Sequence, residues 1–301
     1  MHVPSIRETD EERDVDDIVE LWREALPTDV ISRAAWLHYG RALPPESQLG
    51  DWVAEEGGRV VGTGYVFLGF ASSDRSAHCR VIVRGSHRRR GIGRALFDRV
   101  DAHAAAVGAE RLLVDFEEND GGVAFAESLG FRQVRAEQTA VLDPRTVRLA
   151  PPQGVDLRPL HDVDPRFAYE VDMEAMLDMP STEEFERVDF EDWAGYVLEH
   201  PLLSFDGSFV AVVDGGPAAV SLLVADPESG RGSSMFTGTM RAHRGRGLGL
   251  AVKLASIAWA ARNGIVQLAT RNDETNAPML AINRKLGYRP ATRRLEWLRE
   301  A

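Results

Sequence analysis

Two short runs of arginine and glycine are the part of this sequence best suited to chemistry. The pattern R-x-x-G-x-G occupies residues 88–93 and recurs over residues 244–249. Glycine lacks a Cβ atom, so an anion can approach the main chain there, and the arginines add positive charge. Where such a turn begins a helix, unpaired N–H groups and the helix dipole also favour an anion. Both runs therefore predict a site for a phosphate-bearing cofactor.

Residue spacing separates these runs from other phosphate-binding loops. No lysine-Ser/Thr pair follows the glycines, as a Walker loop requires, and Leu96 and Val252 stand where a Rossmann motif has its third glycine. The basic stretch His87–Arg90 with Arg94 leaves a nucleic-acid contact as a further interpretation. A net charge of −12 argues against a general nucleic-acid binder, because such binding relies on basic surface. The same charge favours cationic partners such as amines.

The two runs belong to an internal repeat that organises the chain. Residues 87–96 correspond to residues 243–252, so that Gly91 answers to Gly247 at an offset of 156. Each half then predicts the same succession: strand, helical region, two strands, a strand entering the glycine run, helix, strand, shorter helix and final strand. Proline and glycine at residues 143–155 predict a linker. We expect two domains of ordinary size, residues 1–148 and residues 149–301.

Particular elements can be assigned within this succession. Residues 58–67 predict a hairpin, and residues 79–83 predict the strand before the first glycine run. Apolar residues at helical spacing after Gly249 predict a helix that ends at Asn263-Gly264. In the second half, strands are expected at residues 209–213, 218–224 and 234–239.

Composition limits the remaining possibilities. Cys79 is the only cysteine, so neither an internal disulfide nor a cysteine-based metal cluster can form within one chain. No apolar run reaches the length of a membrane span, and the first residues lack the pattern of a signal peptide. We expect a cytoplasmic monomer or homodimer that uses no metal and binds neither membrane nor nucleic acid.

The repeated R-x-x-G-x-G run resembles the acyl-coenzyme A loop of the GNAT superfamily of N-acetyltransferases. GNAT domains typically carry an asparagine after the fifth strand and then a helix that ends in Leu-Gly-Phe. The second half matches with Asn276 and residues 286–288, and the first half matches more loosely with Asn119 and residues 128–131. Gly121-Gly122 weakens the predicted helix start in the first half. The resemblance covers nearly the whole chain, and its tandem form is similar to the mycothiol synthase family of two-domain GNAT proteins.

This resemblance implies a fold and a reaction. The fold is of the α/β (α+β) class, with two tandem domains, each a mixed, mainly antiparallel twisted sheet flanked by helices. The reaction is direct transfer of an acetyl (acyl) group from acetyl-CoA to the primary amine of a small molecule. The second half is expected to be catalytic, and the first half to be degenerate or a second cofactor site. Acceptor pockets are expected at residues 22–50 and 170–205, so the acceptor itself stays open.

The resemblance also implies cofactor-binding residues. The pantetheine arm is expected beside the strand end Thr237–Met240, where a main-chain N–H near Thr239 would polarise the thioester carbonyl. Asn276 is expected to bind this arm, to cap the next helix, or to do both. The full set in the second half is Thr237, Thr239, Met240, Arg244, Gly245, Arg246, Gly247, Leu248, Gly249, Asn276 and Asn283. The set in the first half is Val83, Arg88, Arg89, Gly91 and Gly93.

The expected proton-transfer groups are incomplete. Many GNAT enzymes place a tyrosine seven residues after the helix asparagine, where this chain has Asn283 and Ala126. Related tandem enzymes suggest a glutamate on the strand before the loop, where this chain has Ser233 and Ala77. The catalytic candidates are therefore Asn283, Thr239 and Glu174, with Asp172 as a further acidic residue on the acceptor side. The missing groups leave a second function open, that of a catalytically inactive acyl-CoA sensor or structural tandem GNAT protein.

Overall fold

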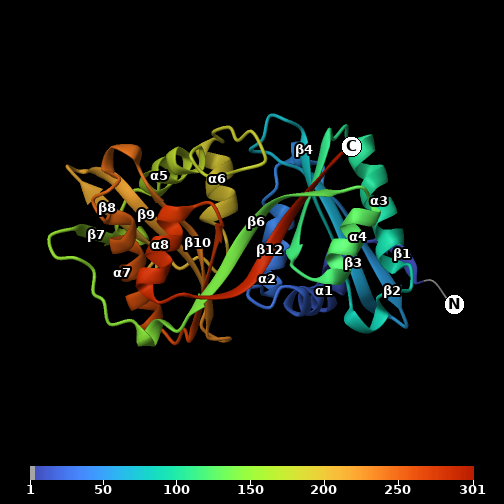
Figure 1. Cartoon of the computed structure of the whole chain (residues 1–301), viewed down its shortest axis with the longest axis horizontal. Coiled ribbons are helices and arrows are strands. Elements are labelled where there is room, and N and C mark those ends of the chain that lie inside the picture. Colours follow the sequence, from blue (N-terminus) through green and yellow to red (C-terminus); the bar gives the residue numbers. More distant parts are fainter. Residues whose placement is uncertain (1–3) are drawn as a thin grey trace. The chain divides into compact units, whose positions relative to one another are not determined.

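The structure, a computed structural model, describes residues 4–301 and divides them into two compact units (Figure 1). Unit 1 takes the residues up to Ala136 together with Thr182–Glu186 and Arg293–Ala301. Unit 2 takes Glu137–Ser181 and Arg187–Thr292. Within the described residues, no helix is long and apolar enough to cross a membrane.

Unit 1 contains a mixed sheet in the strand order β1-β2-β3-β4-β5-β12. Its neighbouring strands are antiparallel except for β4 and β5, which are parallel. The strands are β1 (Ser5–Glu8), β2 (Gly50–Glu56), β3 (Arg59–Leu68), β4 (Ser76–Val83), β5 (Arg111–Glu117) and β12 (Arg289–Glu300). The helices are α1 (Glu11–Ala25), α2 (Arg33–Arg41), α3 (Ile92–Ala106) and α4 (Asp120–Ser128), with short 3-10 turns η1 (Pro45–Ser47) and η2 (Gly85–His87).

Unit 2 repeats this plan in the strand order β6-β11-β10-β9-β8-β7. Its one parallel pair among the described strands is β10 with β11. The strands are β6 (Arg132–Leu142), β7 (Asp156–Pro159), β8 (Phe209–Val213), β9 (Gly216–Asp226), β10 (Arg231–Thr239) and β11 (Gln267–Asp273). The helices are α5 (Arg166–Met176), α6 (Phe190–Val197), α7 (Leu248–Arg262) and α8 (Ala277–Leu286), with 3-10 turns η3 (Pro144–Thr146), η4 (Leu160–Asp162) and η5 (Arg241–His243).

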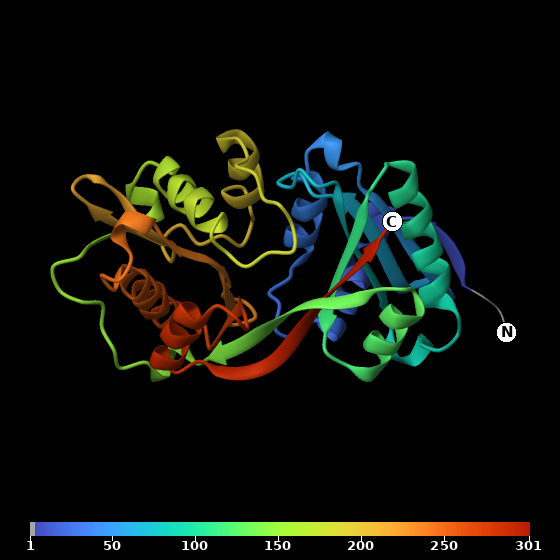
Figure 2. The same ribbon diagram turned by 45° about the horizontal axis from the view of Figure 1, so that its top comes forward.

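Successive side chains along a strand point to opposite faces of the sheet, and in each unit helices cover both faces. In unit 1, Val60 packs with α1 whereas the next residue, Val61, packs with α3. In unit 2, Val210 packs with α5 and α6, whereas Ala211 packs with α7. Figure 2 shows α5 and α7 on opposite faces of the unit 2 sheet. Each unit is thus a mixed, mainly antiparallel sheet with helices on both faces, as the sequence predicts.

The two halves of the sequence exchange their final strands. Strand β12 ends the second half, yet it pairs with β5 of unit 1, for example Trp297 with Val114. Strand β6 ends the first half, and from Glu137 onward it pairs with β11 of unit 2. The boundary predicted between residues 148 and 149 follows the sequence repeat. In the structure, β12 from Arg293 onward belongs to unit 1, and β6 from Glu137 onward belongs to unit 2. That boundary stays a prediction, and each unit needs both halves to complete its sheet.

Most predicted elements lie where they were expected. The strand at residues 209–213 is β8, and the predicted helix after Gly249 is α7, which ends before Asn263-Gly264. The sequence predicts a hairpin within residues 58–67, but these residues instead form most of the single strand β3. The hairpin turn lies just before it, at Gly57 and Gly58, and both glycines have positive φ. A β-turn of this kind needs that left-handed backbone, which residues with a Cβ rarely adopt.

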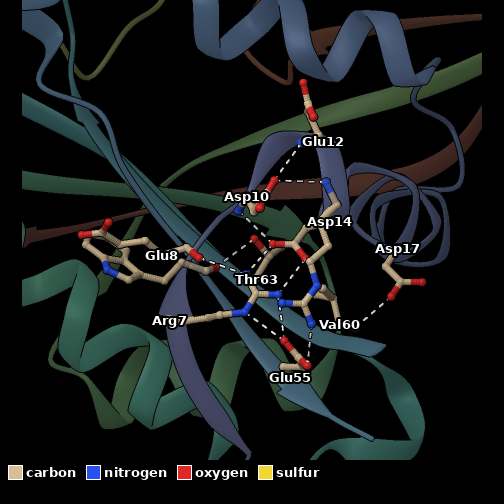
Figure 3. A network of polar contacts seen from close by, with 11 residues as sticks. Arg7, Glu8, Asp10, Glu12, Asp14, Asp17, Glu55, Val60 and Thr63 are labelled. Carbon is tan, nitrogen blue, oxygen red and sulfur yellow. Dashed lines mark hydrogen bonds and ion pairs between the residues drawn. The ribbon is translucent and has the colours of Figure 1, made fainter. Parts of the chain in front are cut away.

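An ion-pair network holds the start of unit 1 together (Figure 3). The Arg7 guanidinium on β1 donates to both carboxylate oxygens of Asp14 on α1, at 2.6 and 2.7 Å, and to Glu55 on β2. Asp14 is 2% exposed, and its hydrogen bond with Arg7 and the main-chain N–H of Asp10 hold its pKa below the usual range against the effect of burial. Arg7 therefore joins β1, α1 and β2, which position the first sheet edge.

Candidate functional site

The two glycine runs adopt the same backbone in both units. After β4 and η2, Gly91 takes φ +83° and α3 begins at the next residue. After β10 and η5, Gly247 takes φ +77° and α7 begins at the next residue. A Cβ placed on either glycine would have no neighbour within 4 Å, so the space in front of each helix start is open. Both turns leave the main chain accessible, as the motif predicts.

The arginine that begins each run acts as a brace for its turn. Arg88 Nε donates to the carbonyl oxygen of Val83 at 3.0 Å, and Arg244 Nε donates to that of Thr239 at 3.1 Å. In each unit the acceptor is the last residue of the strand that enters the turn. The arginine therefore fixes where the turn leaves the strand, besides adding positive charge.

The main-chain N–H groups of both turns are unpaired. Among residues 4–301, no hydrogen-bond acceptor faces the N–H groups of residues 89–94 or those of residues 245–250. The first intrahelical bonds accept at Gly91 and Gly247 instead, from Ala95 and Ala251. Unpaired donors at a helix start, together with the helix dipole, form an anion site. The geometry thus fits the diphosphate that the sequence predicts.

The pairing of the two parallel strands in each unit stops before the first strand ends, and we call this unpaired stretch the gap. In unit 1, β4 pairs with β5 only over Ser76–Cys79, and then continues to Val83 without that partner. In unit 2, β10 pairs with β11 only over Arg231–Ser233, and then continues to Thr239. An extended chain could occupy either gap as an added strand.

Strand β10 carries a β-bulge that β4 lacks. The register of β10 with β9 shifts between Ser234 and Phe236, whereas β4 keeps an unbroken register with β3. Strand β10 accordingly has nine residues and β4 has eight. A bulge bends its strand and increases the local twist. In unit 2 this bend lies where β10 parts from β11.

The strand end Thr237–Met240 offers main-chain donors to the second gap. The Met240 N–H donates to the Ala218 carbonyl on β9 at 2.9 Å. Because N–H groups point to alternate sides along a strand, those of Thr237 and Thr239 point toward β11. The predicted donor at Thr239 therefore faces the gap, whereas the Met240 N–H is used within the sheet.

In unit 1 the gap is part of a cavity of about 720 Å³. The cavity begins at the glycine turn, where Arg88, Arg89 and Gly91 line it, and extends between β4 and β5. Among the apolar side chains that line it are Phe97 of α3, Val114 and Phe116 of β5, Ala126 of α4, and Phe131, which lies between α4 and β6. We call these five positions the floor of the gap.

Ion pairs cross the opposite side of the gap in unit 1. Arg80 on β4 donates to Asp115 on β5 at 2.5 Å, at the first positions after the parallel pairing ends. The same guanidinium lies over the Trp22 ring of α1 at 5.0 Å. Arg294, only 3% exposed, bonds Asp115 as well as Asp29. The α1 side of this gap is therefore occupied by paired charges.

A glutamate from the helix on the acceptor side holds each 3-10 turn. Glu174 on α5 accepts from the Arg241 N–H at 2.5 Å, and Glu24 on α1 accepts from the Gly85 N–H at 2.9 Å. Asp178 accepts from the guanidinium groups of both Arg241 and Arg244, and these hydrogen bonds lower its pKa to about 2. The Glu174 carboxylate is thus engaged with the backbone beside the turn.

The two helix asparagines act as N-caps. Asn119 Oδ1 accepts from the Gly122 N–H at 2.8 Å, and Asn276 Oδ1 accepts from the Met279 N–H at 3.3 Å. Helix α4, which Asn119 caps, forms although it contains Gly121 and Gly122. A Cβ on Gly122 would lie 2.8 Å from the Phe116 ring, so glycine is required there for packing.

Asn283, at the position of the expected tyrosine, lies in the interior of unit 2. It is 4% exposed, and its Nδ2 donates to Asn272 Oδ1 at 2.6 Å. Its own Oδ1 is buried without a hydrogen-bond partner among the described residues. Leaving a buried acceptor unpaired costs free energy, so a donor supplied by a ligand would stabilise this site.

Two of the titratable residues buried in unit 2 are Lys253 and Asp172, and of these only Asp172 was considered from the sequence. Lys253 on α7 is 2% exposed, and burial lowers its pKa to about 7. Asp172 on α5 accepts from the Trp193 indole at 2.8 Å, and burial raises its pKa to about 7 despite that bond. A signal for Lys253 exists in the repeat, because it replaces Phe97 in an otherwise apolar helix face.

Comparisons with known proteins agree with this geometry. The sequence profile of the acetyltransferase (GNAT) family matches residues 15–131 and 168–288, which together span more than half of the chain. A mycothiol acetyltransferase from Clavibacter sepedonicus is 27% identical over 235 residues, covering 73% of this chain and 72% of that protein. Among solved structures, a tandem GNAT protein from the clavulanic acid biosynthesis pathway superposes with a TM-score of 0.74 at 23% identity, covering 98% of both chains. A GCN5-related N-acetyltransferase from Sphaerobacter thermophilus gives a TM-score of 0.71 at 20% identity, covering 98% of this chain and 95% of that one. Two tandem copies of one fold are thus common to this chain and these structures.

Proposed function

The chain belongs to the acetyltransferase (GNAT) family, and from this premise we propose that it transfers an acetyl group from acetyl-CoA to a primary amine of a small molecule. Two observations together carry the proposal: the N–H groups of residues 245–250 are unpaired, and the pairing of β10 with β11 ends at Ser233. Together they offer a site for the diphosphate and a slot for the extended pantetheine arm.

Different residues of this chain would bind different parts of the cofactor. The main-chain N–H groups around Gly247 and Gly249 would bind the diphosphate, and Arg246 would add charge beside it. The N–H groups of Thr237 and Thr239 would pair with the pantetheine arm or polarise the thioester carbonyl. When bound, acetyl-CoA supplies the activated acyl group. Arg244 would act chiefly by bracing the turn, because its Nε is already bonded to Thr239.

We assign transfer to unit 2 for three reasons. The bulge in β10 lies where its strand parts from β11, which turns the backbone of residues 234–239 away from its partner. Asn283 also supplies a buried carbonyl oxygen without a partner. In unit 1 the Arg80–Asp115 ion pair occupies the corresponding approach. Unit 1 would therefore bind acyl-CoA through Arg88, Arg89, Gly91 and Gly93 without transferring the acyl group.

Of the predicted catalytic residues, Glu174 fits a supporting role best. Its carboxylate accepts from the Arg241 N–H, and Glu24 does the same in unit 1, so this contact belongs to the shared architecture of the turn. We therefore propose that Glu174 positions the turn, that Asn283 binds the cofactor, and that the N–H of Thr239 stabilises developing negative charge. The acceptor amine would approach from the α5 and α6 side, within residues 170–205, and the net charge of −12 would favour a cationic acceptor.

Thiol release from acetyl-CoA across a panel of small amines tests this proposal, alongside calorimetry with acetyl-CoA. Thiol release that depends on one class of amine is the expected result. Binding without turnover for any amine would instead select the acyl-CoA sensor. Absence of both binding and turnover would overturn the proposal.

A further inference from the structure

The floor of the gap changes character between the two units. In unit 1 the five floor positions are apolar. The helices and strands that carry them recur in unit 2 at an offset of 156 or 157 residues. The corresponding residues there are Lys253, Thr270, Asn272, Asn283 and Tyr288, all of them polar. Other lining positions stay apolar, since Phe125 and Leu129 answer to Ile282 and Leu286. Polar groups in a protein interior cost free energy unless they are paired, so packing alone does not account for the polar residues at the five floor positions.

Lys253 is the charged member of this set and lies beneath the opening of the gap. Its Nζ donates to Thr270 Oγ1 at 3.1 Å, and lies 5.3 Å from the centre of the Tyr288 ring. Thr270 is the first residue of β11 after its pairing with β10 ends at Ala269. In unit 1 the residues at both positions, Phe97 and Val114, line the cavity. The amine is therefore placed at the floor of the slot, where the strands part.

No carboxylate pairs with this amine among residues 4–301, and burial is the only influence that shifts its pKa, to about 7. The groups that face it are the hydroxyl of Thr270 and the ring of Tyr288, whose own pKa is raised by burial. Lys253 can therefore hold or release a proton near neutral pH, which an exposed lysine does not do.

Lys253 lies on one face of the unit 2 sheet, and this position limits which proton it can transfer. Helices α7 and α8 cover one face, where Leu254 and Leu286 share a cluster with Leu268 of β11. Helices α5 and α6, from which the acceptor would approach, cover the other face. A base for the acceptor amine belongs on the α5 face, whereas an amine on the α7 face can reach the sulfur from below.

Resting on the proposed function, we propose that Lys253 is the proton donor to the departing sulfur in unit 2, in the role that a tyrosine fills in many relatives. As the new amide C–N bond forms, the acceptor nitrogen loses one proton to water. As the C–S bond breaks, its electron pair goes to sulfur. Lys253 Nζ gives its proton to sulfur and becomes neutral. It regains a proton from solvent after the thiol leaves.

This role fixes the sign of a pH effect. The donor must be protonated, so Lys253 supports transfer below its pKa and loses that ability as pH rises through about 7. In the Lys253→Met variant the descending limb of the kcat profile near this pH should disappear. Loss of a positioned proton donor should lower kcat about 100-fold, while KM for acetyl-CoA changes little.

Direct observation of the amine separates a proton donor from a structural lysine. Lys253 and Lys285 are the only lysines in the sequence, so a lysine-specific ¹³C label gives two signals, and the exposed Lys285 serves as internal reference. Bound CoA should shift the titration midpoint of Lys253 from its value in the free protein, because the sulfur and the amine exchange one proton. Bound desulfo-CoA, which lacks the sulfur, should leave the midpoint as in the free protein.

Two variants complete the test. Lys253→Met should fold, because the fold already carries Phe97 at the equivalent position, and calorimetry with acetyl-CoA confirms that its site persists. Ser256→Ala, which removes another buried polar group from α7 where Ser256 bonds Ser221, should keep full kcat. Equal midpoints with CoA and desulfo-CoA, or an unchanged kcat in Lys253→Met, would overturn the proton-donor role. If the wild-type protein showed neither binding nor turnover, the proposed function itself would fail.

Discussion

Arg244 Nε donates to the carbonyl oxygen of Thr239 at 3.1 Å, and the same guanidinium reaches Asp178 through Nη2 at 2.6 Å. One planar side chain thus ties the end of β10 to the segment that follows helix α5. Lysine cannot reproduce two such bonds, because its charge is a single point on a flexible stem.

Arg244→Lys should therefore weaken acetyl-CoA binding to unit 2 about tenfold, since the turn loses its brace while the charge is kept. Isothermal calorimetry measures the affinity. Arg88→Lys is the matched control, because Arg88 makes the corresponding bond to Val83 in unit 1. It should spare the unit 2 site. Equal loss at both sites from either variant would contradict a local brace.

Glutamate in place of the turn glycine should remove one cofactor site at a time. Gly247→Glu and Gly91→Glu each place a carboxylate where no atom lies within 4 Å of a Cβ, so the anion would occupy and repel the diphosphate position. We expect Gly247→Glu to abolish the tighter calorimetric binding and turnover, and Gly91→Glu to leave turnover intact.

Gly247→Ala and Gly91→Ala are the controls for backbone strain, because alanine carries the same left-handed φ without a charge. They should retain most of the binding. If Gly91→Glu alone abolished turnover, the assignment of transfer to unit 2 would be reversed.

The local parts of the site could be predicted from the sequence because they depend on short spacings. A glycine with positive φ, an arginine three residues earlier and an N-capping asparagine each act within a few residues of the chain. The turn at Gly247 and the N-cap at Asn276 therefore lie where the motif places them, and cofactor binding by these residues stays a prediction.

Features that depend on contacts between distant parts of the chain could not be predicted from short spacings in the sequence. Pairing of β12 with β5 joins residues that lie far apart in the sequence, so no local pattern marks it. Met235 is an extra residue in β10, and only a comparison of strand lengths reveals the bulge. The ion pair of Arg80 with Asp115 likewise depends on two strands meeting at their point of separation.

Two adjacent glycines in α4 should respond oppositely to alanine. A Cβ on Gly122 would lie 2.8 Å from the Phe116 ring, so Gly122→Ala should destabilise the protein by about 1–3 kcal/mol through overpacking. The nearest atom to a Cβ on Gly121 is Asn119 Oδ1 at 3.4 Å, so Gly121→Ala should add about 0.5–1 kcal/mol by helix propensity.

Denaturant unfolding of Gly121→Ala and Gly122→Ala measures both changes in the free energy of unfolding. Because Phe116 lines the unit 1 cavity, Gly122→Ala should also weaken cofactor binding there. A stabilising Gly122→Ala would show that the Phe116 ring can move aside without cost.

Asp172 should make stability fall as pH rises. Burial raises its pKa to about 7 in the folded protein, well above the usual 3.8 that applies to the unfolded chain. Between these values the unfolded chain releases a proton that the folded protein keeps, so the free energy of unfolding decreases from about pH 4 to pH 7 and levels off above it. The decrease from this residue is at most about 4 kcal/mol.

Asp172→Asn removes the titration while keeping an oxygen that can accept from the Trp193 indole. Relative to wild type, the variant should therefore gain stability at pH 8 compared with pH 4, as measured by denaturant unfolding across that range. Trp193→Phe is the complementary variant, because it removes the donor that favours the charged form and should steepen the decrease. If Asp172→Asn and wild type kept parallel pH profiles, the carboxyl would have to be ionised throughout, with a charge partner inside the α5–α6 layer.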